Sequence, residues 1–352
     1  MSFASMRTPV TIAQIAEAAG VSTATVDRVL NRRSGVNADT VDRVNEAMRQ
    51  LGASVIGRGR PRVRTYRFAY VLPASPLPFF DTVDRLIAQG AGDFRHSHIT
   101  EVTHRIDVTD PAEFAAQLAR LNDCDGIALL GPDVPAVKLA IADLVQAGVP
   151  VVTLLSAVAG AKREAFIGAD NLAAGRVAGL LLSRMLGPAS RKRPLRVGLL
   201  SPATRFAAQI ERRIGFAQAM EERAPQVDIA RLTDLPESDD AARDALRAWF
   251  EALDDSARLA GIYTVGAGTG GLVRALDEAG HTDSAFGLIA HDLTEVHRGL
   301  LRDGRLAYVL QQDLHYGVMN AAKVLRALCE GVRGALSVVQ PKVEILTAEN
   351  LA

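Results

Sequence analysis

Apolar residues in the first fifty positions recur every three or four residues, in three blocks separated by polar turns. This spacing predicts three short amphipathic helices. Each block starts at a residue that can cap a helix, and two are followed by a glycine that can end one: the caps are Thr11, Ser22 and Asn37, and the glycines are Gly20 and Gly52. Two helices joined by a glycine-containing turn are typical of a helix-turn-helix, although a small helical cap on a larger domain would show the same pattern.

From Tyr66 onward the pattern changes to short apolar runs that alternate with helical stretches. Strands are predicted over residues 67–73, 126–131, 150–155, 195–201, 261–265 and 286–292. Helices are predicted between them, at 111–121, 134–147 and 173–186. Such alternation indicates an α/β fold in which helices cover both faces of parallel sheets, and the chain is long enough for two lobes of this kind.

Composition limits the class of protein. The chain has 352 residues, 48% of them hydrophobic, and its formal net charge is zero. It holds two cysteines, Cys124 and Cys329, too few for a disulfide framework or a cysteine-based zinc site. His291 and His297 have no metal-ligand spacing with other candidates, so no metal is expected. No apolar run is long enough for a signal peptide or a membrane span, which predicts a cytoplasmic protein without a membrane partner.

The zero net charge conceals an uneven distribution. Residues 1–65 contain ten arginines and five acidic residues, a net charge of +5 that leaves −5 for the rest of the chain. No Asp or Glu occurs between Ala47 and Phe80. A basic head on an acidic body predicts that the head alone binds a polyanion.

Two stretches of the head, "TIAQIAEAAGVSTATVDRVLN" (11–31) and "GVNADTVDRVNEAMRQLG" (35–52), resemble the lactose/galactose repressor family. The resemblance implies a helix-turn-helix DNA-binding domain over residues 1–52, whose second helix enters the major groove. Such dimers read two half-sites of a near-palindromic double-stranded DNA operator. By position, the resemblance implies base contacts from Thr23, Ala24 and Arg28, and phosphate contacts from Ser22, Thr25, Asn31 and Thr40. Arginine can grip guanine O6 and N7 through two hydrogen bonds, which suits Arg28.

Asp27 departs from the family pattern, which usually has a small hydroxyl residue there. A carboxylate that faces DNA is repelled by phosphate unless it accepts from cytosine N4 or fixes a neighbouring arginine. We therefore expect Asp27 to orient Arg28 and to influence base preference.

A basic linker, residues 53–66, follows the head and includes "IGRGRPRVRT" (56–65). The resembled family places a hinge helix here, but the glycines and the proline of this segment disfavour a helix. The sequence instead resembles an AT-hook, in which Arg58 and Arg60 would lie in a narrow A·T-rich minor groove. A flexible basic tether is the alternative interpretation, and either arrangement adds attraction to phosphate.

Residues 67–352 resemble the effector-binding core of the same family, which is shared with periplasmic binding proteins. The resemblance rests on "FIGADNLAAGRVAGLLL" (166–182), "ERRIGFAQAM" (211–220), "IAHD" (289–292) and "LQQD" (310–313). It implies a two-lobed core that also dimerises, with effector-binding residues in an interlobe cleft: Asp170, Arg212, Asp292 and Gln312, with Phe79 and Phe80 against an apolar sugar face. Charged groups around a cleft suit a polyol. Asp170 could instead be a helix N-cap, and the two phenylalanines could simply be core.

The segment "VGAGTGG" (265–271) supports an alternative function. Gly266, Gly268 and Gly271 fit the G-x-G-x-x-G pattern of dinucleotide-binding proteins, and Asp292 follows about twenty residues later. An NAD(P)-dependent oxidoreductase with an accessory helical head is therefore the alternative hypothesis. No catalytic His or Lys constellation accompanies the glycines, so we interpret them as a close approach of the backbone to a ligand or to the opposite lobe, and expect neither a cofactor nor an enzyme.

The sequence thus predicts a cytoplasmic, homodimeric transcription regulator whose DNA binding responds to a sugar or sugar-like effector, with repression as the expected mode. Closure of the two lobes around the effector would change the spacing of the paired heads.

Overall fold

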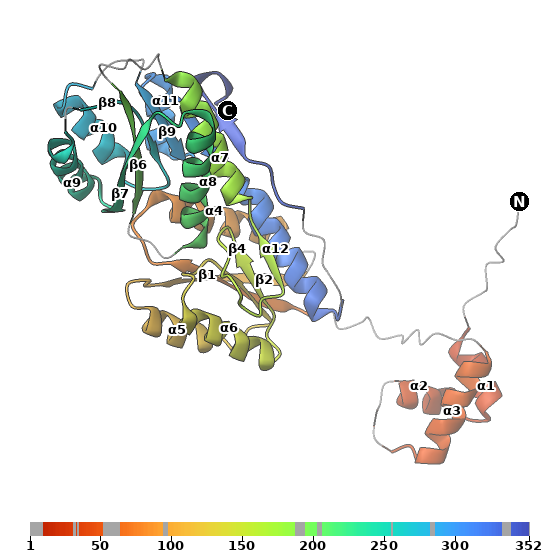
Figure 1. Ribbon diagram of the computed structural model, residues 1–352. Helices are drawn as coiled ribbons and strands as arrows, with labels where there is room; N and C mark the ends of the chain where they lie inside the picture. Colours follow the sequence, from red (N-terminus) through yellow and green to blue (C-terminus); the bar gives the residue numbers. More distant parts are fainter. Residues whose placement is uncertain are drawn as a thin grey trace, which may run out of the picture. The chain divides into compact units, whose positions relative to one another are not determined.

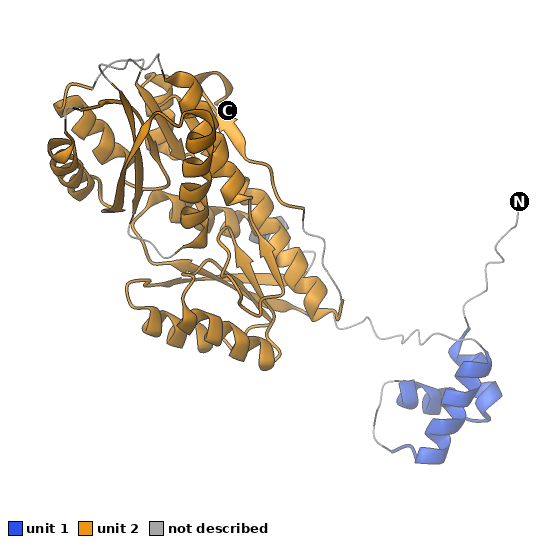
Figure 2. Ribbon diagram, in the orientation of Figure 1, with its two compact units in different colours: residues 1–64 blue, residues 65–352 orange. Residues whose placement is uncertain are grey.

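The structure is a computed structural model that describes residues 10–30, 33, 35–51, 64–93, 98–186, 194–202, 206–254, 256–281, 286–332 and 339–351. The chain divides into two compact units, residues 1–64 and residues 65–352 (Figure 2). The smaller unit is helical, and the larger one consists of sheets and helices.

The small unit contains α1 (Ile12–Ala19), α2 (Thr23–Leu30) and α3 (Ala38–Gln50). The predicted caps Thr11, Ser22 and Asn37 are confirmed, whereas Gly52 lies outside the described residues. Thr11 forms a capping box with Gln14, and Gly20 ends α1 in the left-handed conformation at φ 63°. The Ser22 hydroxyl accepts from the Thr25 amide at 3.1 Å, and Asn37 caps α3.

The three helices share a small apolar core in which Val26 and Val44 are fully buried. One polar contact ties α3 to the turn between α1 and α2. The Arg43 guanidinium donates to the carbonyl oxygens of Ala19 at 2.6 Å and Gly20 at 3.1 Å. Carbonyls at the end of α1 that would otherwise lack a partner are thereby satisfied, which fixes the position of α2.

The first lobe of the larger unit is a parallel sheet of five strands in the order β2-β1-β3-β4-β5. The strands are β1 (Tyr66–Pro73), β2 (Ile99–Ile106), β3 (Gly126–Leu129), β4 (Val151–Leu154) and β5 (Ala165–Ile167). Helices α5 (Pro111–Ala119) and α6 (Pro135–Gln146) pack on one face through one apolar cluster. Helices α4 (Pro78–Asp93) and α12 (Leu314–Cys329) pack on the other through a second cluster (Figure 1).

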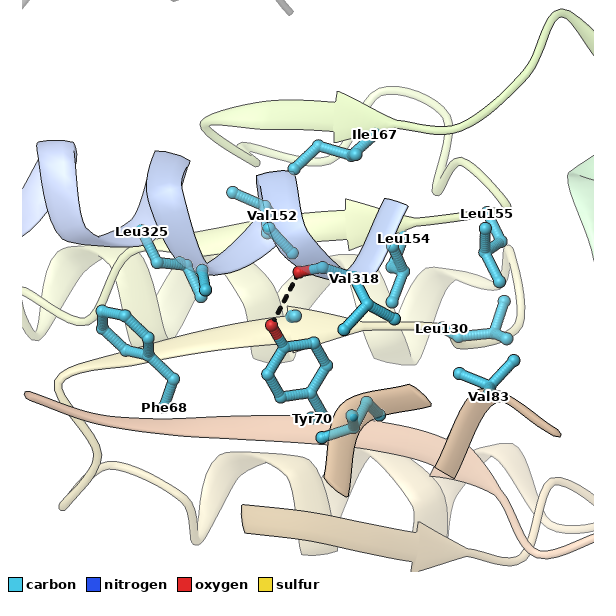
Figure 3. Packing of buried hydrophobic residues seen from close by; sticks show 14 of the residues in the cluster. Phe68, Tyr70, Val83, Leu130, Val152, Leu154, Leu155, Ile167, Val318 and Leu325 are labelled. Carbon is cyan, nitrogen blue, oxygen red and sulfur yellow. Dashed lines mark hydrogen bonds between the residues drawn. The ribbon is translucent and has the colours of Figure 1, made fainter. Parts of the chain in front are cut away.

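Helix α12 completes this lobe although it comes from the far end of the chain. Figure 3 shows its Val318 and Leu325 above the strand residues Phe68 and Tyr70. The Tyr70 hydroxyl, which is fully buried, donates to the Val318 carbonyl oxygen at 3.0 Å. Along the sequence, the chain therefore returns to the first lobe at α12, after strands β6 to β10 of the second lobe.

The second lobe is a sheet of six strands in the order β11-β10-β9-β8-β6-β7, parallel except for β11. The strands are β6 (Leu195–Pro202), β7 (Asp228–Leu235), β8 (Arg258–Thr264), β9 (Gly287–His291), β10 (Tyr308–Gln311) and β11 (Glu344–Leu346). Helices α7 (Asn171–Met185) and α8 (Ala207–Arg223) cover one face. Helices α9 (Asp239–Ala252), α10 (Thr269–Glu278) and α11 (Glu295–Arg302) cover the other (Figure 1). A 3-10 turn, Ala348–Asn350, follows β11.

Helices α7 and α8 are in backbone contact through two glycines. A β-carbon on Gly175 would lie 2.0 Å from the Arg212 carbonyl oxygen, and one on Gly215 would lie 2.1 Å from that of Leu172. No other residue type fits at either position. This close approach brings the first turn of α7 beside the middle of α8, where candidate site residues lie.

The predicted α/β fold with two lobes and an all-α N-terminal region is confirmed. All six predicted strands and the three predicted helices of the core are present, with ends shifted by a few residues. The prediction missed β2, β5, β7, β10 and β11, which are edge strands or segments of only three or four residues.

Candidate functional site

The first candidate site is the outer face of α2 in the small unit. Thr23, Ala24 and Arg28 are all exposed, and Ala24 and Arg28 are one helical turn apart on the same side. Ser22 is exposed at the start of the helix, while Thr25 and Thr40 are partly buried beside the caps that they help to form. The face predicted to read bases is therefore open to a partner.

The predicted role of Asp27 stays a prediction. Its carboxylate forms an ion pair with Arg33 at 3.6 Å, and both side chains are largely exposed. Asn31 and the linker residues Arg58 and Arg60 lie outside the described residues, so their predicted contacts also stay predictions.

The second candidate site is a cleft between the two lobes, at the carboxyl ends of the parallel strands. Ligands of open α/β sheets bind at this end, because the loops that follow the strands converge there. Its central part, called here the first compartment, encloses about 580 Å³ including its open mouth. It is lined by Leu77, Phe79, Phe80, Leu130, Leu155, Ser156, Phe206, Ala208, Gln209, Arg212, Glu237, Gly266, Asp292 and Gln312.

A buried polar network forms the floor of the first compartment. Arg212, on α8, is 5% exposed and donates to the Asn171 side-chain oxygen at 2.8 Å and to the Val265 carbonyl oxygen at 3.4 Å. Its guanidinium also forms an ion pair with Asp292 at 3.5 Å. The other carboxylate oxygen of Asp292 accepts from the Gln312 amide at 2.9 Å. The network orders donors and acceptors before any ligand arrives.

The Asp292 backbone is strained in a way that aims its carboxylate. Its φ of 58° lies in the left-handed region, which is unfavourable for a residue with a side chain. The His297 ring holds it there, since Nδ1 is 2.7 Å from the Asp292 carbonyl oxygen. A carbonyl only accepts, so Nδ1 carries the proton and Nε2 accepts from the Thr269 hydroxyl, 3.0 Å away. Burial lowers the pKa of His297, which agrees with a neutral ring.

One acceptor in the network has no donor among the described residues. The side-chain oxygen of Gln312 is buried and makes no hydrogen bond. A buried polar atom without a partner costs free energy, so the polar groups of this network are not all satisfied within the described residues.

The two sides of the first compartment differ in chemistry. The first lobe contributes mainly apolar side chains: Leu77, Phe79, Phe80, Leu130 and Leu155. The second lobe contributes Gln209, Arg212, Glu237, Asp292 and Gln312, together with Phe206. Phe79 and Phe80 therefore line the cleft and also pack against the core of the first lobe, with their rings in edge contact at 5.2 Å. Their predicted contact with a sugar face stays a prediction.

Asp170 has a different place from the one predicted. Its side chain is exposed, is absent from the described lining of the cleft, and caps α7 by accepting from the Ala173 amide at 2.8 Å. The residue that faces inward is the next one, Asn171, which is 1% exposed and holds Arg212. The sequence analysis also missed Glu237, which follows β7 and accepts from the Ser75 hydroxyl of the first lobe at 2.8 Å.

A second compartment adjoins the first along the cleft and encloses about 820 Å³ including its mouth. It is lined by Pro76, Leu77, Pro78, Phe79, Glu237, Ser238, Asp239, Gly266, Ala267, Gly268, Thr269, Gly270, Thr294, Val296 and His297. Residues 266–270 of the glycine-rich segment thus line the cleft.

The first turn of α10 already receives a carboxylate. Asp239 accepts from the Gly271 amide at 3.2 Å, and its side chain fills the space beside Gly270. In dinucleotide-binding proteins a pyrophosphate occupies this position, where it would be repelled here by the Asp239 carboxylate. The local geometry therefore argues against the cofactor interpretation of these glycines.

Within the described part of the chain, no group of three or more His, Cys, Asp or Glu side chains could hold a metal ion. No helix in the same residues has both the length and the apolar character needed to cross a membrane.

Comparison with known proteins defines the class of both units. Residues 11–52 match the model of bacterial regulatory proteins of the lacI family, and residues 68–332 match the periplasmic binding protein domain. A comparison with curated protein sequences finds no match.

Solved structures share the fold of the core at low sequence identity. GanP, a glucose-galactose binding protein from Geobacillus stearothermophilus, is 18% identical with a TM-score of 0.69, over 82% of this chain and 99% of its own. A solute-binding protein from Burkholderia graminis, solved with D-arabinose, is 18% identical with a TM-score of 0.72, over 82% and 97%. A protein from Bacteroides fragilis assigned as a LacI transcriptional regulator is 22% identical with a TM-score of 0.67, over 82% and 98%.

The protein therefore combines a helix-turn-helix head with a core of the periplasmic-binding-protein type. Its core belongs to the periplasmic-binding-protein domain family and its head to the lacI family of bacterial regulatory proteins, and the protein is a ligand-responsive, DNA-binding transcription regulator.

Proposed function

We propose that this regulator is a cytoplasmic homodimeric repressor whose operator binding is controlled by a sugar or polyol in the interlobe cleft. The observation that carries the effector assignment is the buried network of Arg212, Asp292 and Gln312, which faces an apolar wall across the first compartment. Hydroxyl groups can bind these polar groups, and ring carbons of a sugar suit the apolar wall opposite. Two of the solved proteins with this fold bind glucose and galactose or D-arabinose.

The same proposal assigns the DNA-binding residues. Thr23, Ala24 and Arg28 read base edges, and Ser22, Thr25, Asn31 and Thr40 hold phosphates. Asp27 adjusts base preference, while Arg58 and Arg60 contact the minor groove or simply attract phosphate. The exposed face of α2 supports this assignment. The chain acts as a regulator rather than as an enzyme, because the cleft residues are arranged to bind hydroxyl groups and Asp239 occupies the position of a cofactor phosphate.

The test is selection of bound sequences from a random DNA pool by the purified full-length protein, with Arg28→Ala as the matched control. A palindrome with an A·T-rich centre is expected, and Arg28→Ala should relax base preference within the half-sites. A palindrome without base preference at its centre would indicate that the arginine linker is a flexible tether and does not bind the minor groove. Failure to enrich any sequence, together with NAD detected in the purified protein by mass, would refute the proposal and favour the oxidoreductase.

A further inference from the structure

The two compartments of the cleft are joined at residues that line both. Leu77, Phe79, Glu237 and Gly266 belong to each lining. At Gly266 there is no side chain, and a β-carbon built there would meet only the Gln209 amide, at 3.3 Å. The space that a side chain at position 266 would occupy is therefore open, so that one ligand can extend from the first compartment into the second.

The walls of the second compartment match the two surfaces of a sugar ring. The first lobe contributes an apolar wall, Pro76–Phe79. The second lobe contributes hydroxyl and carboxylate groups from Glu237, Ser238, Asp239 and Thr294. A pyranose ring has an apolar face formed by its C–H groups and hydroxyl donors around its edge, so it can meet both walls at once.

The charge of this compartment is negative. Glu237 and Asp239 are its acidic side chains, and none of its described lining residues is Lys or Arg. Burial lowers the pKa of His297, so its ring adds no positive charge here. A phosphate or carboxylate on the ligand would be repelled here, whereas hydroxyl groups can donate to the carboxylates.

The junction between the compartments carries one acidic side chain in a fixed position. Glu237 accepts from the Ser75 hydroxyl through Oε2, and Ser75 in turn accepts from the Leu77 amide at 3.2 Å. The remaining carboxylate oxygen, Oε1, can accept from a hydroxyl that passes between the compartments.

We propose that the effector is a neutral disaccharide or glycoside, with its first ring on Arg212, Asp292 and Gln312 and its second ring in the second compartment. This inference rests on the proposed function, because it assumes that a sugar binds at the first compartment. It assigns the glycine-rich segment 266–270 a role in recognition of the second ring.

The test is titration calorimetry on the full-length protein with glucose, galactose and fructose, and with the disaccharides maltose, cellobiose, lactose, melibiose, sucrose and trehalose. At least one disaccharide is expected to bind ten-fold or more tightly than either of its component monosaccharides. Glucose 6-phosphate is expected to bind more weakly than glucose.

The matched variants are Val296→Trp and Val296→Ala. Val296 is 45% exposed on α11 and lines the second compartment but not the first. Val296→Trp should fill the second compartment and abolish the advantage of the disaccharide while the Kd of the monosaccharide stays the same. Val296→Ala should keep the advantage, and unchanged melting temperatures would show that both variants fold.

The outcomes separate this inference from the proposed function. If a monosaccharide binds as tightly as every disaccharide that contains it, the second ring has no site and the inference fails, while the sugar effector stands. Val296→Trp weakening both sugars equally would also overturn the inference. If none of these sugars binds at all, the sugar effector of the proposed function fails and the inference fails with it.

Discussion

The buried pair Arg212 and Asp292 offers a direct test of how the cleft is held together. Arg212→Ala would leave the Asp292 carboxylate, whose side chain is 12% exposed, with the Gln312 amide as its remaining partner in the network. Removing one partner of a buried ion pair costs about 3–5 kcal/mol, because the other charge stays buried without compensation. Asp292→Ala should cost a similar amount, since it leaves the guanidinium with Asn171 and the Val265 carbonyl.

The double variant, Arg212→Ala with Asp292→Ala, measures the coupling free energy between the two side chains. When both charges are removed no uncompensated charge remains, so the loss of stability should be smaller than the sum of the single losses. For residues in one network we expect a coupling free energy of about 1–3 kcal/mol.

Arg196→Ala is the matched control for loss of a buried arginine. Arg196 is 8% exposed in the same lobe and pairs with Asp228 and Asp254, whose side chains are 57% and 68% exposed. Water can solvate those carboxylates after the substitution, so we expect a loss of about 1–2 kcal/mol, close to that of ordinary hydrogen bonds.

The assay is urea unfolding of the full-length protein, followed by tryptophan fluorescence. Trp249 is the single tryptophan of the chain and lies on α9 in the second lobe. The three substituted residues, Arg212, Asp292 and Arg196, belong to the same lobe. Two results would refute a coupled, buried pair. One is additive losses of unfolding free energy for Arg212→Ala and Asp292→Ala, and the other is a loss for Arg212→Ala no larger than that for Arg196→Ala.

Three further predictions concern stability and DNA binding. Burial raises the pKa of Glu101 to about 7. The neutral carboxyl therefore stabilises the fold fully below about pH 4.5, and this stabilisation is lost as the pH rises through 7. Glu101→Gln should raise the melting temperature at pH 8 and change it little at pH 4.5. Gly215→Ala should lower the free energy of unfolding by about 1–3 kcal/mol or more in urea, because the added β-carbon overlaps α7. The control Gly299→Ala, in open space on α11, should raise it by about 0.5–1 kcal/mol. Arg28→Ala should cost about 1–3 kcal/mol in binding to the selected operator, measured by fluorescence anisotropy, and an equal loss on random DNA would contradict base readout.

The helices of the head could be predicted almost to the residue because their signals are local. Caps such as Thr11 and Asn37 act within three residues of their partners, and the core of three short helices follows from one apolar face on each. Nothing outside the unit is needed to position them.

The edge strands β2 and β7 could not be predicted from continuous apolar runs. Strand β2, "ITEVTHRI", lies at the edge of the first sheet and is only partly buried over most of its length. Strand β7 lies at the edge of the second sheet and has the same mixed burial. An edge strand keeps polar residues where one side meets solvent, so its sequence lacks the apolar run of a central strand.

The cleft network could be predicted only in part. Arg212 and Asp292 are eighty residues apart, and the family resemblance rather than any local signal brings them together. The two interpretations of Asp170 could not be separated from the sequence, because a polar residue at the start of a helix can cap it or face inward, and the choice depends on the packing of α7 on α8. That packing is set by Gly175 and Gly215, whose significance appears only when the two helices are in contact.

The asymmetry of the cleft explains how a ligand can change the protein rather than merely occupy it. A ligand shifts a conformational equilibrium only by the difference between its affinities for the two states. Most of the polar network lies in the second lobe, where Arg212 contacts both Asn171 and Asp292. The Asn171 amide also donates to the carbonyl oxygen of Leu155, in the first lobe, at 3.4 Å. The apolar wall belongs to the first lobe, so the free energy of burying the sugar against Leu77 and Phe79 is gained only when the lobes close. Under the proposed function, we therefore expect closure and regulation to depend on the apolar side of the sugar, and its hydroxyl groups to contribute mainly to binding.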